Sequence, residues 1–161
     1  MFGVGDKVVY PMYGAGVIEE LEHKFIDGAE QTYYVMRIPV GNLKIFVSVK
    51  NAESLGIREI MDSESLTKTI SEVKEKPIVM DENWNKRYRD NMEKIKTGKM
   101  SEVVEVYRNL HQRENQRGLS NAEKKVLSTA KQIILSEIIL SHNVTKSEAE
   151  LILEATIRSA N

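Results

Sequence analysis

Hydrophobic residues follow one spacing in the first part of the chain and a different spacing in the rest. Up to about residue 60, short runs of β-branched and aromatic residues alternate with polar residues, and turns that contain glycine or proline separate the runs. This pattern predicts five antiparallel strands, at 7–10, 16–25, 32–38, 43–49 and 57–60. Five short strands in so short a segment predict a small SH3- or Tudor-like barrel.

From residue 62 onward, apolar residues recur every three or four positions, which is the spacing of amphipathic helices. The segments that begin at Ser120 and Thr145 open with capping boxes, a sequence signal for the start of a helix. Helices are expected over 65–75, 83–96, 101–117, 120–141 and from 145 onward. The fold class is therefore α+β with two domains, a Tudor-like domain over 1–62 and an all-α domain of about five helices over 63–161.

The charge is nearly balanced overall but uneven along the chain. The sequence holds 23 basic and 24 acidic residues, which excludes a surface that is positive all over for general nucleic-acid binding. Within residues 83–118, however, there are nine basic residues and five acidic ones. Charged helical faces are commonly just solvated, so this surplus supports a nucleic-acid contact without deciding for one. Any such contact has to be local.

The single tryptophan, Trp84, opens this basic segment. Tyr88, Met92 and Ile95 follow it at the spacing of one helical stripe, and a tryptophan at the head of such a stripe is commonly packed in a core. The other interpretation gives Trp84 an exposed, working role in binding. The stripe alone leaves both interpretations open.

Three cations follow Trp84 within five positions, namely Lys86, Arg87 and Arg89. They lie in the first turns of the predicted helix, where the helix dipole disfavours positive charge. Cations placed against that local preference indicate an anionic partner that compensates them, such as phosphate. The segment that opens with Trp84 is therefore the candidate nucleic-acid site.

The strand predicted over 43–49 has the pattern of a sheet edge. Lys44, Phe46 and Ser48 share one face of this strand, since side chains alternate between the two faces. Phe46 on this otherwise polar face is either an exposed anchor for a partner or a residue that is packed because the sheet is covered on both sides. Small barrels of this class bind peptides or strand edges and seldom carry out chemistry.

The sequence offers no constellation of residues for catalysis. It contains no cysteine, so disulfide and thiolate chemistry are absent, as suits a reducing cytoplasm. The histidines lie in different segments without a second ligand at metal-binding spacing, at His23, His111 and His142. No serine lies in a nucleophile elbow and no glycine pattern matches a phosphate-binding loop. We therefore expect that the protein is not an enzyme and that it has no cofactor, no metal site and no small-molecule substrate.

The composition of the apolar stretches also bears on where the protein acts. Residues 1–6 lack a basic region followed by an apolar run, so no secretory signal is expected. The longest apolar pieces, 133–135 and 138–140, are separated by Ser136 and Glu137 and are far too short for a membrane span. We expect a cytoplasmic protein without a membrane partner.

Two sets of motifs resemble a known family. Val4 to Pro11 followed by Gly14 to Val17 resembles the opening of the bacterial CarD/CdnL transcription regulators, which the polymerase-interacting module of transcription-repair coupling factors shares. Asn83 to Tyr88 with Asn91 to Lys94, and Gln116 to Lys124, resemble the CarD/CdnL helical domain specifically. The resemblance extends over essentially the whole chain, and the second set makes it specific to CarD/CdnL.

This resemblance implies a function and two partners. The Tudor-like domain would bind the β subunit of RNA polymerase, in part by laying an edge strand against a strand of that subunit. The helical domain would reach promoter DNA at the upstream edge of the melted bubble, where the residue matching Trp84 wedges into the minor groove. Such proteins stabilise the open complex, need no cofactor and would be associated with the nucleoid through the polymerase.

The resemblance also implies roles for individual residues. The DNA contacts beside Trp84 fall on basic residues, at Lys86, Arg87, Arg89 and Lys124. The polymerase contacts fall at Lys24, Lys44 and Phe46. Some relatives carry an arginine where this chain has Phe46, so the polymerase interface here is expected to be more apolar.

Two other functions remain open from the sequence. One is a two-domain protein–protein adaptor without direct DNA contact, in which Trp84 is a core residue and the basic helix is solvated surface. The other is an autonomous sequence-specific DNA-binding protein, which would need a helix that reads a groove. The exposure of Trp84 discriminates the adaptor from the polymerase-bound regulator.

Overall fold

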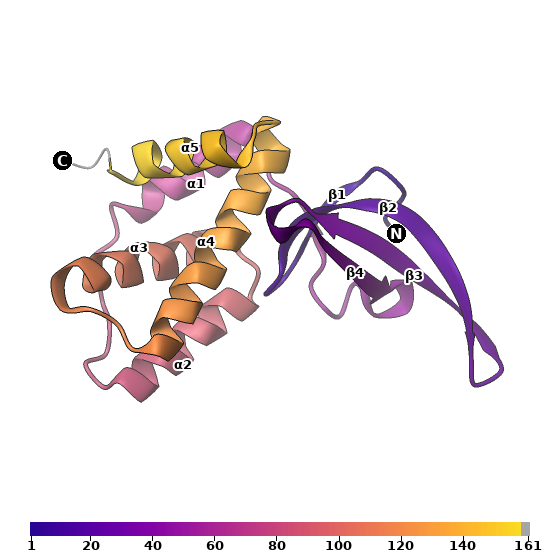
Figure 1. The fold of residues 1–161 in the computed structure, drawn as a ribbon, viewed down its shortest axis with the longest axis horizontal. Coiled ribbons are helices and arrows are strands. Elements are labelled where there is room, and N and C mark those ends of the chain that lie inside the picture. The colour runs from indigo at the N-terminus through magenta and orange to yellow at the C-terminus, as the bar shows by residue number, and fades with distance from the viewer. Residues whose placement is uncertain (159–161) are drawn as a thin grey trace.

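A computed structural model of the chain describes residues 1–158, which form a β-sheet domain followed by five helices (Figure 1). The strands form one antiparallel sheet in the order β4-β3-β2-β1-β5. Their bounds are β1 Lys7–Tyr10, β2 Gly14–Ile26, β3 Ala29–Ile38, β4 Leu43–Ser48 and β5 Arg58–Glu59. The predicted fold class, a Tudor-like β domain followed by an all-α domain, is confirmed.

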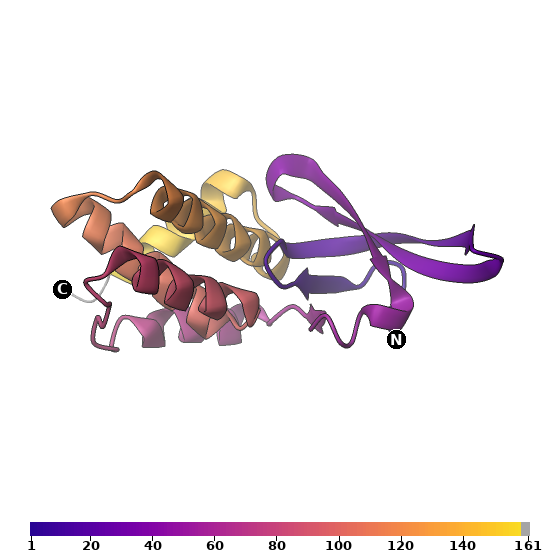
Figure 2. The same cartoon turned by 90° about the horizontal axis from the view of Figure 1, so that it is seen from below.

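Strands β2 and β3 form a hairpin that is longer than the rest of the sheet (Figure 2). Its turn residues, Asp27 and Gly28, have φ angles of 52° and 79°, as a two-residue hairpin turn with the twist of the flanking strands requires. Ile26 pairs with Ala29 directly across the turn. A bulge between Ile18 and Glu20 bends β2 partway along its length. The hairpin tip therefore extends away from the helices.

The strand order places β4 at one edge of the sheet, as predicted. Short 3-10 turns flank this strand, η1 at Val40–Asn42 and η2 at Val49–Asn51. In β4, Phe46 lies opposite Val35 of β3, and Lys44 lies opposite Arg37. The core of the β domain lies on the other face of the sheet, where the buried apolar side chains include Val8, Ile18, Tyr34, Met36, Ile38 and Val47.

The helices begin and end where local capping allows. They are α1 Ser63–Val73, α2 Trp84–Lys96, α3 Met100–Arg117, α4 Asn121–His142 and α5 Lys146–Arg158. The carboxylate of Asp62 caps α1, and the hydroxyl of Ser120 caps α4. Glu148 and Thr145 exchange hydrogen bonds in the second capping box, which opens α5.

Helix α4 is the centre of the helical domain. It contacts each of the other four helices and also strand β2, so that it joins the two domains (Figure 1). Its buried residues include Val126, Ala130, Ile133, Ile134 and Ile138. Because the apolar sides of four helices meet on α4, its position fixes where the other helices present their outer surfaces.

Candidate nucleic-acid interface

The tryptophan of the candidate site lies at the first position of α2. The side-chain oxygen of Asn83 accepts hydrogen bonds from the backbone amides of Asn85 at 3.0 Å and Lys86 at 3.2 Å, which starts the helix at Trp84. The Trp84 side chain is in large part outside the core, since the residue is 50% exposed. Of the two interpretations left open by the sequence, the exposed ring is the one that the structure favours.

The buried side of α2 consists of Arg87, Asn91 and Ile95 rather than the stripe headed by Trp84. Tyr88 and Met92 lie at the margin of that side and are half-buried against the helical core. Trp84 lies one turn before Tyr88 along the same margin, beyond the end of the core. Ile95 of the predicted stripe is thus in the core, whereas Trp84 is at the surface.

Arg87 differs from its predicted role as a DNA contact, because it is only 3% exposed. Its Nε donates to Oε2 of Glu123 at 2.6 Å and its Nη2 donates to Oε1 at 2.9 Å, in a two-pronged ion pair between α2 and α4. Its Nη1 donates to the backbone carbonyls of Asp81 and Glu82. With these donors occupied inside the protein, Arg87 anchors the start of α2, and this arrangement argues against the DNA contact that was predicted for it.

The Arg87–Glu123 pair also accounts for the charge at the start of the helix. Hydrogen bonds from Arg87 lower the pKa of Glu123 below its ordinary value of 4.5, and the same contact raises the pKa of Arg87. The hydroxyl of Ser120 adds a further hydrogen bond to Glu123 at 3.2 Å. For this cation, the compensating anion expected from the sequence is therefore a carboxylate within the chain.

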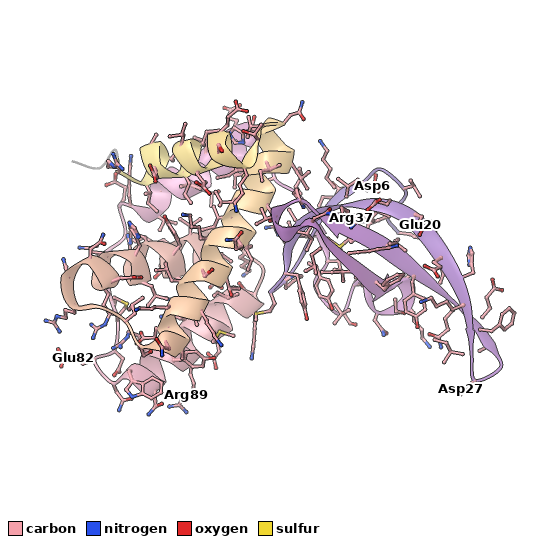
Figure 3. All side chains as sticks on the ribbon, in the orientation of Figure 1. Asp6, Glu20, Asp27, Arg37, Glu82 and Arg89 are labelled. Atoms are coloured by element: carbon pink, nitrogen blue, oxygen red, sulfur yellow. The ribbon has the colours of Figure 1, made fainter. Side chains whose placement is uncertain are left out.

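Lys86 and Arg89 remain at the surface of α2. The Nζ of Lys86 lies 3.4 Å from a carboxylate oxygen of Asp81 and 3.9 Å from one of Asp90, in exposed pairs that bind weakly. Arg89 is exposed, and among residues 1–158 no ion pair involves it. Figure 3 shows Arg89 at the end of the helical domain that is remote from the β domain. These two cations can turn to a phosphate without breaking a buried contact.

A shallow, largely apolar groove between α2 and α4 continues the surface that begins at Trp84. Tyr88 and Met92 line it on the α2 side, and Asn121 and Lys125 line it on the α4 side. Lys124 lies in a different groove, between α3, α4 and α5. The structure thus places Lys125, which the sequence interpretation did not single out, beside Tyr88. The doublet Lys124-Lys125 was visible in the sequence, but only the position of the helix decides which lysine faces α2.

The three residues predicted to contact a polymerase form one cluster on the β domain. Phe46 is 44% exposed, and the Nζ atoms of Lys24 and Lys44 lie 4.5 Å and 5.5 Å from the centre of its ring. Lys24 also lies 5.6 Å from the ring centre of Tyr33. These are cation–π distances, so the two lysines and the ring stabilise one another across β2, β3 and β4. Phe46 is therefore exposed rather than covered on both sides.

Two further apolar side chains are exposed beside the hairpin tip, Ile26 on the sheet face that carries Lys24 and Phe46, and Phe25 on the opposite face. Phe25 is 78% exposed and Ile26 is 39% exposed, directly before the turn at Asp27. They were missed because residues beside a hairpin turn were assigned to a half-buried strand. Figure 3 shows Asp27 at the tip, at the opposite end of the molecule from Arg89. The molecule thus presents an apolar and basic surface at each end.

Two features are absent from residues 1–158, namely a metal-binding cluster and a membrane-spanning helix. Within that range, no group of three or more histidine, aspartate or glutamate side chains is placed to hold a metal ion. Within the same range, no helix combines the length and apolarity that crossing a membrane requires.

Comparison with known proteins covers both domains. Residues 2–61 match the family model of the CarD-like/TRCF RID domain, and residues 66–154 match that of the CarD C-terminal domain. A protein of Bacillus subtilis (strain 168) with the name "Putative transcription factor YdeB" is 33% identical over 148 residues, which cover 92% of this chain and 97% of that protein. The chain therefore belongs to the CarD family, whose members are non-catalytic transcription regulators that interact with RNA polymerase.

Proposed function

We propose that this CarD-family protein binds the β subunit of RNA polymerase through the surface around Phe46 and stabilises the promoter open complex with Trp84. The indole would enter the minor groove at the upstream edge of the melted bubble. The observation that carries the proposal is the exposure of Trp84 at the start of α2, where the helix end is anchored and half of the residue's surface is open to solvent. The adaptor alternative was argued from a buried Trp84, so the exposure of this residue supports the polymerase-bound regulator instead.

The state of the DNA at the edge of a bubble determines the energetic cost of inserting a ring there. Inserting an apolar side chain between base pairs costs a few kcal/mol for unstacking, and at the edge of a bubble part of that unstacking has already occurred. Stacking of an aromatic ring on a base contributes about 1–3 kcal/mol. If this interaction is present only in the open complex, it lengthens the lifetime of that complex by about five- to a hundredfold.

The cations around the ring supply a weak and local attraction to the DNA backbone. Lys86 and Arg89 are exposed on the helix that Trp84 opens, and Lys125 is exposed beside Tyr88, one turn along from Trp84. With so few cations, the protein would bind free DNA with a dissociation constant on the order of 10⁻⁴–10⁻⁶ M, and this binding would depend strongly on salt. Such an affinity becomes useful when a second contact to the polymerase raises the effective concentration of the ring at the promoter.

The polymerase contact would use the edge strand and the aromatic cluster together. Strand β4 can add to a strand of the partner through its backbone, because it is an edge of the sheet. Phe46 and Ile26 would supply apolar contacts, and Lys24 and Lys44 would pair with carboxylates at the rim.

The test is the lifetime of open complexes challenged with a competitor, with the variant Trp84→Ala compared at saturating protein. We expect the lifetime to fall about five- to a hundredfold, while binding to polymerase is retained. Trp84→Phe keeps a ring and is expected to fall between the two. The matched control is Leu151→Ala, which removes another exposed apolar side chain, on α5. An unchanged lifetime with Trp84→Ala would remove the wedge from the proposal.

A further inference from the structure

Two buried ion pairs attach different parts of the molecule to the same helix. At the start of α4, Glu123 holds Arg87 and with it the segment that presents Trp84. Further along α4, Glu137 holds Arg58 of strand β5, which belongs to the β domain. Both glutamates are almost fully buried, at 2% and 0% exposure. Each pair is two-pronged, so it fixes orientation as well as distance.

The second pair forms the centre of the joint between the domains. The Arg58 nitrogens Nη1 and Nη2 donate to the two carboxylate oxygens of Glu137 at 3.0 Å and 2.8 Å. The backbone amide of Met61 donates to the same carboxylate at 2.8 Å, and Nε of Arg58 donates to the carbonyl of Gly98 at 3.1 Å. The Glu137 carboxylate is thus bonded directly to β5 and to the start of the helical domain. Arg58 in turn also bonds to the turn between α2 and α3.

Other contacts close the joint around this pair. The backbone amide of Ala15 in β2 donates to the hydroxyl of Ser136 in α4 at 2.8 Å. The Nζ of Lys7 donates to the carbonyl of Leu140 at 3.3 Å. A Cβ atom added at Gly14 would come within 2.6 Å of the Ser136 hydroxyl, so the strand and the helix meet without room for a side chain between them. Directional bonds and close packing together limit rotation of one domain on the other.

The spacing of the two glutamates along α4 gives these contacts a common geometry. Glu123 and Glu137 are fourteen residues apart in one uninterrupted helix. With a rise of 1.5 Å and 100° per residue, their attachment points are about 21 Å apart along the axis and about 40° apart around it. The β domain and the Trp84 segment are therefore held on nearly the same side of one rigid rod.

We propose that Arg58 and Glu137 are positioning residues, which set the position of Trp84 relative to the polymerase-binding surface by fixing the β domain on α4. The functional consequence rests on the proposed function above. A tethered ring raises its effective concentration at the bubble only if the tether holds it at the right place, so a loosened joint weakens the DNA contact without changing either binding surface.

The first measurement is the distance between spin labels on the two domains, for which the cysteine-free chain is well suited. Cysteines introduced at the exposed positions Glu53 and Gln116 carry the labels. Two joint variants are compared, Arg58→Ala and the double change Arg58→Met with Glu137→Leu. The double change removes both charges, and replacing a buried pair with apolar groups commonly preserves folding.

We expect one narrow distance distribution in the otherwise unchanged protein and a broader one in both joint variants. In the same variants, open-complex lifetime is expected to fall roughly tenfold, while the affinities for polymerase and for free DNA stay within about twofold. The matched control is Arg158→Ala, which breaks an arginine–glutamate pair that is exposed on α5. That control is expected to leave both the distances and the lifetime unchanged.

Equally narrow distributions in the folded joint variants would overturn the proposal, as would broadened distributions with an unchanged lifetime. Failure of the double variant to fold, judged by circular dichroism, would assign the pair to folding and overturn the positioning role. The distance measurement does not depend on Trp84. If Trp84→Ala leaves the lifetime unchanged, the proposed function fails while the distances still decide whether the pair fixes the joint.

Discussion

The two ends of the molecule both present an exposed aromatic ring among cations, but the cations serve different purposes. Around Phe46, the ammonium groups of Lys24 and Lys44 lie against the ring itself. At Trp84, no cation within residues 1–158 lies over the indole, and the nearby Arg87 points inward to Glu123. Because lysines already occupy a face of the Phe46 ring, this ring is suited to contact with a protein rather than to stacking on a base. The indole of Trp84 has no cation from the described residues over it and can stack on a base.

The difference also extends to what holds each ring in place. Phe46 lies within strand β4, where pairing with β3 holds it opposite Val35 and Lys44 lies on the same face. Trp84 is the first residue of helix α2, and its position depends on the cap at Asn83 and on the anchor at Arg87. The Phe46 ring is therefore part of a sheet surface, whereas the Trp84 ring is a single side chain at the end of a helix. Substitutions at Phe46 and at the anchor of Trp84 can distinguish these two arrangements.

The largest effect is expected from the anchor of the Trp84 end. Arg87→Ala leaves Glu123 buried without its partner, which costs about 3–5 kcal/mol of unfolding free energy. Arg89→Ala, the matched control two residues along the same helix, is exposed and should change that free energy by less than about 0.5 kcal/mol. Urea unfolding of both variants measures the difference. Equal losses would show that burial of Arg87 does not distinguish it from its neighbour.

The pH dependence of stability gives a second view of the same anchor. The folded protein lowers the pKa of Glu123, so the pair contributes fully above the ordinary value of 4.5 and loses its contribution as the pH falls through the folded pKa. Urea midpoints from about pH 7 down to about pH 3 should therefore fall more steeply in the unchanged protein than in Glu123→Gln. The control Glu154→Gln removes an exposed carboxylate and should follow the unchanged protein.

At the other end of the molecule, a loss of partner binding is expected without a loss of stability. Phe46→Ala removes an exposed ring at the centre of the lysine cluster and should weaken binding to polymerase by about 1–3 kcal/mol. Its unfolding free energy should change little, since the ring contributes little to the core. Leu55→Ala, which changes an exposed side chain elsewhere in the β domain, is the matched control in a titration of polymerase. Undiminished binding by Phe46→Ala would place the polymerase contact elsewhere.

The smallest expected effect distinguishes two adjacent lysines. Lys125→Ala should reduce the slope of the logarithm of DNA affinity against the logarithm of salt concentration by about one, since Lys125 lines the groove beside Tyr88. Lys124→Ala should leave that slope unchanged, because Lys124 faces the groove between α3, α4 and α5. The reverse result would return Lys124 to the DNA contact originally expected of it.

Local signals in the sequence were sufficient for most of the fold. The capping boxes at Ser120 and Thr145 and the turn at Asp27–Gly28 depend on neighbouring residues, and the structure contains all three. Strand β3 begins at Ala29, three residues before the predicted start at residue 32. The hairpin lengthens the strand because pairing with β2 continues through polar residues that carry no hydrophobic pattern. The division of the chain at 62/63 stays a prediction.

The candidate site was harder to predict because it depends on distant partners. A periodic pattern counts arginine and asparagine as surface residues, yet Arg87 and Asn91 form the buried side of α2. The burial of Arg87 is explained by Glu123, which lies 36 positions later in the chain. No local pattern contains that pairing. The contacts assigned to DNA and to polymerase remain proposals that the measurements above address.

The length of α4 has a mechanical consequence for the way this protein could be adjusted. Between Glu137 at the joint and Glu123 at the end that supports Trp84, the helix extends over about 21 Å. A rotation of about 9° at the joint would displace the far end of this lever arm by about 3.4 Å, the separation of successive bases along a strand. Small changes in interdomain packing would thus be sufficient to shift the proposed contact point on a promoter by one nucleotide.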